Sequence, residues 1–591
     1  MERLARFWRE YASAFKGPYT FGALFLIATN ALAVAIPGFV QHAVDALGAP
    51  GADPQVAAQD ARQWGLAIVA AGFGIIGVRT LSRTLIFNPG RTIEFRMKNN
   101  LFDRLLALPR TFYDRMRAGE IVSRGTNDAN WMRALVGFGT LQLVNVVMSL
   151  TFTLGQMLLD DWVLTLGCVL PLVVAGLVLR RAIGTMFGVT QQFNGAIATL
   201  SNRILETYSG IGVLQAYGAL GPATRRFDET NEELERLGMA LARIRSMLLP
   251  VVSVTGNLCI VVVLLLGGYR VQSGDLTLGQ LASFTVYVNL LVNGMTGFGW
   301  LVNAVQRGWL SLGRIYDVID APADRPTPTG QVPVPGPRGH AVEVRDLTFA
   351  YPLAPDRLSL KQVSFRVASG ETVGLFGFTG AGKSTLLSLL ARVYDAPAGT
   401  VFVDGVDVTT VPVEDWRAAV ACVPQEPWLF STTLARNIAL SERGTSPDPV
   451  RLRAAVSDAA LDVDLEAFPE GLETLVGERG ITLSGGQRQR AALARAFYRD
   501  FRLLLLDDVM SAVDHATEKR LIDAVYRRCG AATTLLVSHR CSVLARADRV
   551  LVFDDGRLVA DAHHSVLVQG DGPYARAWRL QQAAEALEGA P

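Results

Sequence analysis

The stretch that decides the fold of the C-terminal half is Gly377-Phe378-Thr379-Gly380-Ala381-Gly382-Lys383-Ser384-Thr385. It follows the apolar run Thr372–Phe376, which predicts a buried strand, and it precedes a predicted helix. The glycines let backbone N–H groups wrap around phosphate oxygens, while Lys383 reaches the β- and γ-phosphates and the Ser384 hydroxyl binds Mg²⁺. The motif and its strand–loop–helix context therefore predict an ATP-binding loop with Mg²⁺ as the associated metal.

A carboxylate motif lies further along the chain. The run Leu503–Leu506 predicts a buried strand, and Asp507 follows it directly. A carboxylate at the end of a strand beside a phosphate loop is the usual second Mg²⁺ ligand. Asp507 is therefore expected to hold the metal together with Ser384, on an α/β domain.

The composition indicates a membrane protein with more than one domain. The chain has 591 residues, which exceeds what one hydrophobic core normally supports. Half of its residues are hydrophobic and only 19% are charged. The net charge is +2 with dispersed basic residues, so no nucleic-acid partner is expected. The cysteines lack the spacing of a metal site and are expected as small buried side chains: Cys168, Cys259, Cys422, Cys529 and Cys541.

Six apolar stretches occupy the N-terminal half, and each approaches or exceeds the length of about 20 residues that crosses a bilayer. They cover residues 19–47, 64–87, 135–159, 162–179, 248–269 and 278–302. Two long polar segments, residues 91–131 and 180–245, each carry eight basic side chains. Because basic segments stay in the cytoplasm, both segments and both termini are expected there. We therefore expect a multi-pass protein of the bacterial cytoplasmic membrane, in contact with membrane lipid.

A proline-rich segment separates the two halves. It covers residues 321–340 and is typical of an extended tether, with prolines at Pro322, Pro326, Pro328, Pro333, Pro335 and Pro337. Beyond it, short β-branched runs alternate with helical patterns and glycine-rich turns, which indicates an α/β domain. We therefore expect a transmembrane domain over 1–320, a linker over 321–340, a nucleotide-binding domain over 341–580 and a tail over 581–591.

The residues that point to a family are Leu483-Ser484-Gly485-Gly486-Gln487, followed by a helical run. The motif resembles the signature of ATP-binding cassette (ABC) proteins, and the resemblance extends over essentially the whole chain. It implies that the motif caps ATP held by an opposite subunit, in a dimer. The physical chemistry agrees, because Ser484 and the glycines would offer a helix N-terminus to the γ-phosphate. The implied fold is multi-domain: an all-α six-helix transmembrane domain of the type I ABC exporter fold, and an α/β P-loop nucleotide-binding domain.

The resemblance implies roles for five further positions. Tyr351 is similar to the aromatic residue that stacks on adenine, and Gln425 to the loop glutamine that touches Mg²⁺. His539 is similar to the switch histidine that contacts the γ-phosphate. Ser511 and Asp514 resemble the loop that connects the two ATP sites of a dimer.

Other segments resemble exporters in particular. Thr474, Gly477 and Glu478, just before the signature, match a loop that meets the cytosolic extensions of the membrane helices. Within those extensions, residues 112–128 and 206–217 resemble the two coupling regions. The membrane half therefore resembles an exporter independently of the ATPase half.

One position departs from the family pattern. Asp508 follows Asp507 where the family has a glutamate as its catalytic base. Aspartate is one methylene shorter, so its carboxylate lies on the order of 1 Å further back, and such a displacement can cost about 100-fold in rate. We expect a site that binds ATP but hydrolyses it poorly, with Asp508 and His539 as its catalytic side chains. In the family, such a chain commonly pairs with a homologous half-transporter that carries the glutamate.

Several functions stay open at this stage. The favoured one is ATP-driven export of small amphipathic or hydrophobic substrates, with drugs ahead of lipids and peptides. The alternatives are a homodimeric exporter or lipid flippase in which Asp508 hydrolyses ATP slowly, a nucleotide-gated channel or regulatory subunit, and an importer with an exporter-like fold. Polar residues within the apolar stretches fit substrate contact and helix packing equally: Arg79, Arg83, Asn145, Asn257, Asn289, Asn293 and Asn303.

Overall fold

The computed structural model describes residues 2–48, 53–322, 330–336, 338–442, 447–466, 468–477, 480–510, 515–530 and 532–588. Three of the predicted site residues, Glu478, Ser511 and Asp514, lie outside these ranges, as does part of the proline-rich segment. The chain divides into two compact units. One is Met1–Leu106 with Gly119–Ala321, and the other is Ala107–Ala118 with Pro322–Pro591.

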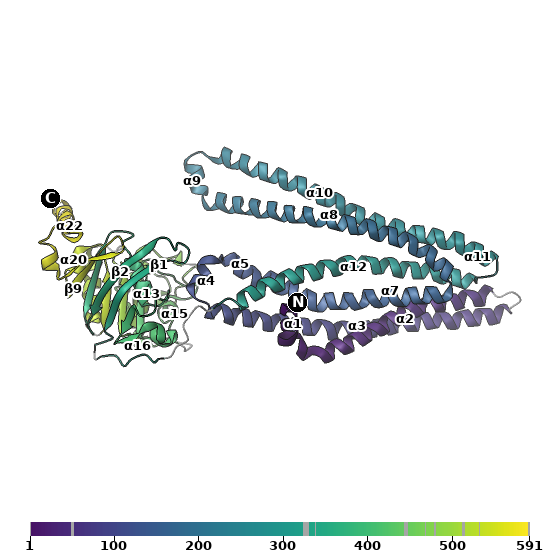
Figure 1. The fold of residues 1–591 in the computed structure, drawn as a ribbon, viewed down its shortest axis with the longest axis horizontal. Helices are drawn as coiled ribbons and strands as arrows, with labels where there is room; N and C mark the ends of the chain where they lie inside the picture. Colours follow the sequence, from purple (N-terminus) through teal and green to yellow (C-terminus); the bar gives the residue numbers. More distant parts are fainter. Residues whose placement is uncertain are drawn as a thin grey trace. The chain divides into compact units, whose positions relative to one another are not determined.

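The first unit is built from long helices (Figure 1). Within the described residues, six helical stretches are long and apolar enough to cross a membrane, which confirms the predicted number of apolar helices. Their principal elements are α2 (Lys16–Gly48), α3 (Pro54–Ala107), α7 (Thr140–Asp160), α8 (Trp162–Ser209), α10 (Leu220–Val262) and α12 (Leu278–Ile319). Shorter elements are α1 (Glu2–Phe7), η1 (Trp8–Ala12), η2 (Ser13–Phe15), α5 (Ala118–Ser123), η3 (Arg124–Asp128), α6 (Ala129–Ala134), η4 (Leu135–Gly139), α9 (Ile211–Ala216), η5 (Val263–Gly267) and α11 (Gly268–Gln272).

These helices are much longer than a bilayer is thick. Helix α3 has 54 residues and therefore rises about 80 Å, whereas the hydrocarbon core of a membrane is about 30 Å thick. Helices α8 and α10 run side by side and are joined by the short helix α9 (Figure 1). Each long helix must therefore continue outside the bilayer, as the polar segments 91–131 and 180–245 indicate.

Polar contacts join the helices, while their outer faces are apolar. Asn30 Nδ2 of α2 donates to Asn145 Oδ1 of α7 over 3.2 Å, so Asn145 takes part in helix packing. Asp45, near the end of α2, accepts hydrogen bonds at the N-terminus of α12, including one of 2.8 Å from the Gly279 N–H. By contrast, Phe73 of α3 and Leu170 of α8 are 73% and 67% exposed. Such outward-facing apolar side chains suit contact with lipid.

The second unit contains two β-sheets. The smaller sheet has the strand order β2-β1-β4-β5, with β1 (Val342–Ala350) antiparallel to β2 (Leu358–Val367) and β4 (Val401–Val403), and β5 (Val406–Asp407) at its edge. The larger sheet has the order β10-β9-β3-β8-β7-β6. Its strands β9 (Arg549–Asp554), β3 (Thr372–Gly377), β8 (Thr533–Val537), β7 (Leu503–Asp507) and β6 (Val420–Val423) are parallel, and β10 (Arg557–Ala562) is antiparallel.

Helices complete the second unit. They are α4 (Arg110–Arg115), α13 (Lys383–Leu390), α14 (Val413–Ala419), α15 (Leu434–Ile438), α16 (Pro449–Asp458), α17 (Asp462–Leu465), α18 (Gly485–Tyr498), α19 (His515–Cys529), α20 (Cys541–Leu544), α21 (His564–Leu567) and α22 (Pro573–Glu588). Helix α22 continues past residue 581, at which the predicted C-terminal tail begins. The strands β3, β7 and β8 are buried along their whole length, as the apolar runs Thr372–Phe376 and Leu503–Leu506 predict for β3 and β7.

Candidate functional site

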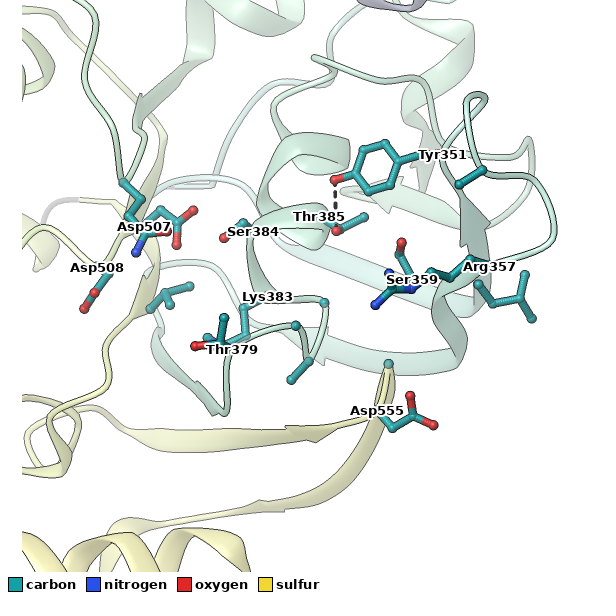
Figure 2. A pocket seen from close by; sticks show the side chains of 18 of the residues that line it. Tyr351, Arg357, Ser359, Thr379, Lys383, Ser384, Thr385, Asp507, Asp508 and Asp555 are labelled. Carbon is teal, nitrogen blue, oxygen red and sulfur yellow. Dashed lines mark hydrogen bonds between the residues drawn. The ribbon is translucent and has the colours of Figure 1, made fainter. Parts of the chain in front are cut away.

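The carboxyl ends of the parallel strands bring most of the predicted site residues together. The phosphate loop follows β3, Asp507 ends β7, and Gln425 and His539 follow β6 and β8. Adjacent parallel strands end at the same edge of a sheet, where α/β proteins place their ligand sites. A cavity of about 430 Å³ opens there. It is lined by Tyr351, Ala354, Arg357, Leu358, Ser359, Thr379–Thr385, Gln425, Asp507, Asp508, Val537, His539, Asp555 and Gly556 (Figure 2).

The phosphate loop depends on glycine at Gly382. Its backbone has φ +96°, and a Cβ atom there would lie 2.6 Å from the carbonyl oxygen of Ser359. Both the positive φ and the close approach exclude a larger side chain without rearrangement. Helix α13 begins at the next residue, so the free N–H groups of its first turn face the cavity side of the loop.

Lys383 is held inside this loop. Its Nζ atom donates to the carbonyl oxygens of Gly377 at 2.7 Å and Phe378 at 3.0 Å, and the residue is 6% exposed. Burial lowers the pKa of Lys383, while the nearby carboxylates of Asp507 and Asp508 act in the opposite direction. The ammonium group is therefore a poorly hydrated cation in the centre of the loop, suited to an anionic ligand.

Asp507 lies next to the phosphate loop. Burial raises the pKa of its carboxyl group, the neighbouring Asp508 raises it further, and a hydrogen bond from Ser384 lowers it. Figure 2 shows Asp507 beside Ser384. This pair therefore offers two adjacent oxygen donors, the hydroxyl and the carboxylate.

Asp508 also lines the cavity but is arranged differently. Its backbone is left-handed, with φ +50°, a conformation that aspartate tolerates better than most residues. Its N–H donates to the Val537 carbonyl at 3.1 Å, which fixes its backbone against β8. In Figure 2 its carboxylate points away from Ser384. The two adjacent aspartates therefore present their carboxylates to different parts of the site.

Tyr351 stands at the other side of the cavity. Its Oη atom lies 3.0 Å from Thr385 Oγ1, at the start of α13 (Figure 2). The rings of Phe349 and Tyr394 contact its ring edge-on, with centroids 5.3 Å and 5.2 Å away. These contacts fix the orientation of an aromatic ring at the rim of the cavity.

The signature residues Leu483–Gln487 lie in the same unit but are not among the described residues that line the cavity. Ser484 caps helix α18 in a capping box: its hydroxyl accepts from the Gln487 N–H, and the Gln487 side chain accepts from the Ser484 N–H. Asp464 of α17 holds the same turn, because it accepts from Gln487 Nε2 at 3.3 Å and pairs with Arg490 through two hydrogen bonds of 2.7 Å and 2.9 Å. Ser484 and Gly485 are exposed.

The predicted coupling residues Thr474 and Gly477 lie beside the segment that follows Gln425. The Leu434 N–H donates to the Thr474 carbonyl at 3.0 Å, and the Val476 N–H donates to the Thr432 carbonyl at 2.9 Å. The chain segments after Gln425 and before the signature are therefore hydrogen-bonded to one another.

Seven lining residues were not predicted from the sequence: Ala354, Arg357, Leu358, Ser359, Val537, Asp555 and Gly556. Arg357 and Ser359 lie at the start of β2 and add a cation and a hydroxyl near Tyr351. Asp555 and Gly556 form the turn between β9 and β10, and Gly556 approaches the backbone of Ser359 closely. The Asp-Gly pair is a recognisable turn signal, but nothing local in the sequence shows that this turn borders the cavity.

Comparison with known proteins places this geometry in a family. Residues 19–295 match the family described as the ABC transporter transmembrane region, and residues 360–511 match the ABC transporter family. The chain is 32% identical over 505 residues to the probable multidrug resistance ABC transporter ATP-binding/permease protein YheI of Bacillus subtilis, covering 85% of this chain and 86% of that protein.

Two further similarities extend the comparison. The chain is 30% identical over 529 residues to the ATP-dependent lipid A-core flippase of Burkholderia orbicola, covering 89% of this chain and 88% of that protein. A solved structure of a bacterial Atm1-family ABC exporter with ATP bound superposes with a TM-score of 0.82 at 26% identity, covering 95% of this chain and 98% of that one. The six apolar helical stretches among the described residues, the nucleotide-binding domain and these relatives show the family. The protein belongs to the ABC transporter family, as a multi-pass exporter half-transporter with an ATPase domain.

Proposed function

We propose that this chain is one subunit of a heterodimeric ABC exporter whose own ATP site binds ATP but hydrolyses it slowly. The transporter moves amphipathic or hydrophobic substrates outward across the bacterial cytoplasmic membrane, with the cassette and both termini in the cytosol. The observation that carries the proposal is a cavity lined by Tyr351, the phosphate-loop residues Thr379–Thr385, Gln425, Asp507 and His539, in which Asp508 stands where the family has glutamate.

The residues around the cavity fit ATP with Mg²⁺. The Ser384 hydroxyl, the Asp507 carboxylate and the Gln425 side-chain oxygen are the hard oxygen ligands that Mg²⁺ prefers, and these three residues would hold the ion. When bound, the ion neutralises charge on the β- and γ-phosphates. Lys383 and the N–H groups of the loop hold the phosphates, and Tyr351 holds the adenine.

Asp508 is the residue that slows ATP hydrolysis at this site. A general base must reach the proton that it removes, either directly or through one water molecule. The shorter side chain sets the carboxylate back by on the order of 1 Å, and a misplacement of this size costs about 100-fold. His539 stays available for the γ-phosphate, so binding is preserved while hydrolysis is slow.

The signature end of α18 supports a two-chain transporter. Ser484 and Gly485 at this end are exposed, whereas the Gln487 N–H is taken up by the Ser484 hydroxyl, and none of the signature residues is among the described residues that line the chain's own cavity. Anion binding at such a helix end requires that a partner bring the phosphate. We infer that Ser484 acts on ATP held by a homologous partner carrying glutamate.

The relatives support the substrate class. Their names specify multidrug resistance and lipid A-core flipping, and we infer an amphipathic or hydrophobic substrate for this chain from the same range of cargo. The exposed apolar faces of α3 and α8 provide a surface in contact with lipid, from which such molecules would enter.

The experiment that tests the proposal compares phosphate release by the purified chain and by Asp508→Glu. The wild-type chain should release phosphate slowly, and Asp508→Glu should increase the rate by about 10- to 100-fold without changing ATP affinity. Rapid hydrolysis by the wild-type chain alone that is abolished in Asp508→Asn would instead support a homodimer with a working Asp508.

A labelling experiment tests the membrane orientation. Single cysteines introduced at Asp53 and Arg117, both exposed, should react with an impermeant thiol reagent from opposite sides of the membrane. The native cysteines are replaced first. Labelling of both positions from the same side would contradict the proposed topology.

A further inference from the structure

Helix α22 reaches back to the loop that carries His539. Gln581 of α22 donates from Nε2 to the His539 carbonyl at 2.7 Å. The same side chain accepts from the Cys541 N–H at Oε1, over 2.8 Å. One side-chain amide therefore satisfies a backbone acceptor and a backbone donor on either side of the turn that leads into α20.

Other hydrogen bonds also hold this loop. The Ser538 N–H donates to the Leu375 carbonyl at a long 3.4 Å, and the Arg540 N–H donates to Ser538 Oγ at 3.0 Å. A second residue of α22, Tyr574, donates to the Cys541 carbonyl at 3.4 Å. Gln581 thus makes the two shortest of these contacts, which bracket the histidine backbone.

Helix α22 is itself anchored to the sheet that carries the phosphate loop. Tyr574 is buried, and its ring packs edge-on against Phe376 of β3 with centroids 5.0 Å apart. Its Oη atom also lies 2.8 Å from Nδ1 of His564. Phe376 lies at the end of β3, directly before the phosphate loop. Helix α22 therefore packs against the end of β3 through Tyr574 and contacts the His539 loop through Gln581.

We propose that Gln581 is a positioning residue for His539, acting through the backbone of residues 539–541. The imidazole lines the cavity near Asp507, and its place there depends on the backbone that Gln581 holds. This inference rests on the proposed role of His539 as the γ-phosphate contact. The Gln581 side chain makes both contacts with backbone atoms, of His539 and of Cys541, and through that backbone it sets where the imidazole stands.

The test uses Gln581→Met, which keeps the side-chain volume and removes both hydrogen bonds, with the exposed neighbour Gln582→Met as the matched control. Affinities for fluorescent ATP and ADP analogues are measured on the purified full-length chain with Mg²⁺. Gln581→Met should lower ATP affinity by about 5-fold, the effect of one net hydrogen bond, and leave ADP affinity unchanged. Gln582→Met should change neither affinity.

A double-mutant cycle separates positioning from a merely structural role. In the His539→Ala background, Gln581→Met should cause no further loss of ATP affinity, because the group that it positions is already absent. Equal losses for ATP and ADP, or losses that add to those of His539→Ala, would overturn the inference.

Hydrogen exchange makes the outcome independent of the histidine's role. The Cys541 amide should exchange faster in Gln581→Met than in Gln582→Met, since it loses its acceptor. Unchanged exchange at residues 538–541 refutes the inference whatever His539 does. If His539→Ala alone leaves the preference for ATP over ADP unchanged, the γ-phosphate contact in the proposed function is wrong, whereas faster exchange at Cys541 still supports the positioning of the loop by Gln581.

Discussion

The phosphate-loop cavity and the signature end of α18 lie in one cassette but are built in opposite ways. The cavity buries its charges, with Lys383 and Asp507 only 6% and 8% exposed. At the signature end, Ser484 and Gly485 are exposed. The capping box and the hydrogen bond to Asp464 fix this end of α18 to the rest of the domain.

The difference concerns what each region needs in order to bind phosphate. In the cavity, cation, hydroxyl and loop N–H groups converge within one chain, where low polarity strengthens their interaction with an anion. An exposed helix end offers oriented N–H groups but keeps competing water until another surface covers it. On the proposed function, nucleotide held at Lys383 therefore needs only this chain's cavity, whereas the contribution of Ser484 needs a partner.

The largest effect is expected from Ser484→Arg in the assembled transporter. The added bulk and positive charge should block closure over the partner's ATP and reduce phosphate release by at least about 100-fold. Asp508→Asn should leave most of the activity intact, because this chain's site contributes little hydrolysis. Phosphate release from the co-purified pair measures both variants.

Ser457→Arg is the matched control, because it adds the same side chain to an exposed position of α16. It should have no effect. If Asp508→Asn is as damaging as Ser484→Arg, the two ATP sites are equivalent and the heterodimer proposal is wrong.

Lys383→Ala tests the cavity side of the comparison. It removes the buried cation, and ATP affinity of the purified chain should fall by about 30- to 100-fold, as expected for charge-assisted hydrogen bonds to phosphate. Lys361→Ala, which breaks an ion pair with Asp555 at the cavity rim, should cost much less. Equilibrium binding of a fluorescent ATP analogue measures both, and equal losses would contradict a central role for Lys383.

Asp464→Ala tests the contacts that hold the signature end of α18. Removing this carboxylate frees Gln487 and leaves Arg490, whose side chain is 12% exposed, without its partner. We expect about a 5-fold loss in phosphate release by the pair and a lower melting temperature of the cassette. Asp462→Ala, on the same short helix but in an exposed pair with Arg520, should change both only slightly.

Local patterns predicted much of the fold and of the cavity. The six apolar helices and the strand–loop–helix at Lys383 each have a signal contained in one continuous stretch. The second apolar stretch was predicted to end at residue 87 and to be followed by a long helical extension, and α3 is one continuous helix through Pro89 to Ala107. Hydropathy indicates where a helix leaves the hydrocarbon core of the membrane, but not where the helix ends. Pro89 is a weak signal of a helix end because a packed helix can accommodate a proline.

Contacts between residues far apart in the chain could not be predicted from the sequence. Gln581 and His539 are 42 residues apart, and Asp464 and Gln487 are 23 apart. No periodicity or turn signal links such pairs, because the link exists only once the sheet and helices are assembled. Arg357 and Ser359 were missed for the same reason, although the loop that they border was predicted.

The smallest expected effect concerns the cost of burying charge in the cavity. The folded pKa of Asp507 is raised, chiefly by burial, so the folded state binds its proton more tightly than the unfolded chain does. The sign follows from linkage: protonated Asp507 favours the folded cassette below its unfolded pKa of about 3.9, and this benefit is lost as the pH rises through the folded pKa. At pH 7 the ionised carboxylate therefore destabilises the nucleotide-free cassette.

Asp507→Asn should consequently raise the melting temperature of the nucleotide-free protein at pH 7, with a gain that shrinks toward pH 4. Asp500→Asn, at a side chain that is 99% exposed, should show no such gain. The same Asp507→Asn variant should lose most of the extra stabilisation that Mg²⁺ adds to ATP, because its amide is a weaker ligand than a carboxylate. Thermal melts with and without Mg²⁺ and ATP measure both effects. A lower melting temperature without nucleotide would mean that the Ser384 hydrogen bond and the Lys383 charge outweigh burial, and that the cavity is stable in its charged form before ATP binds.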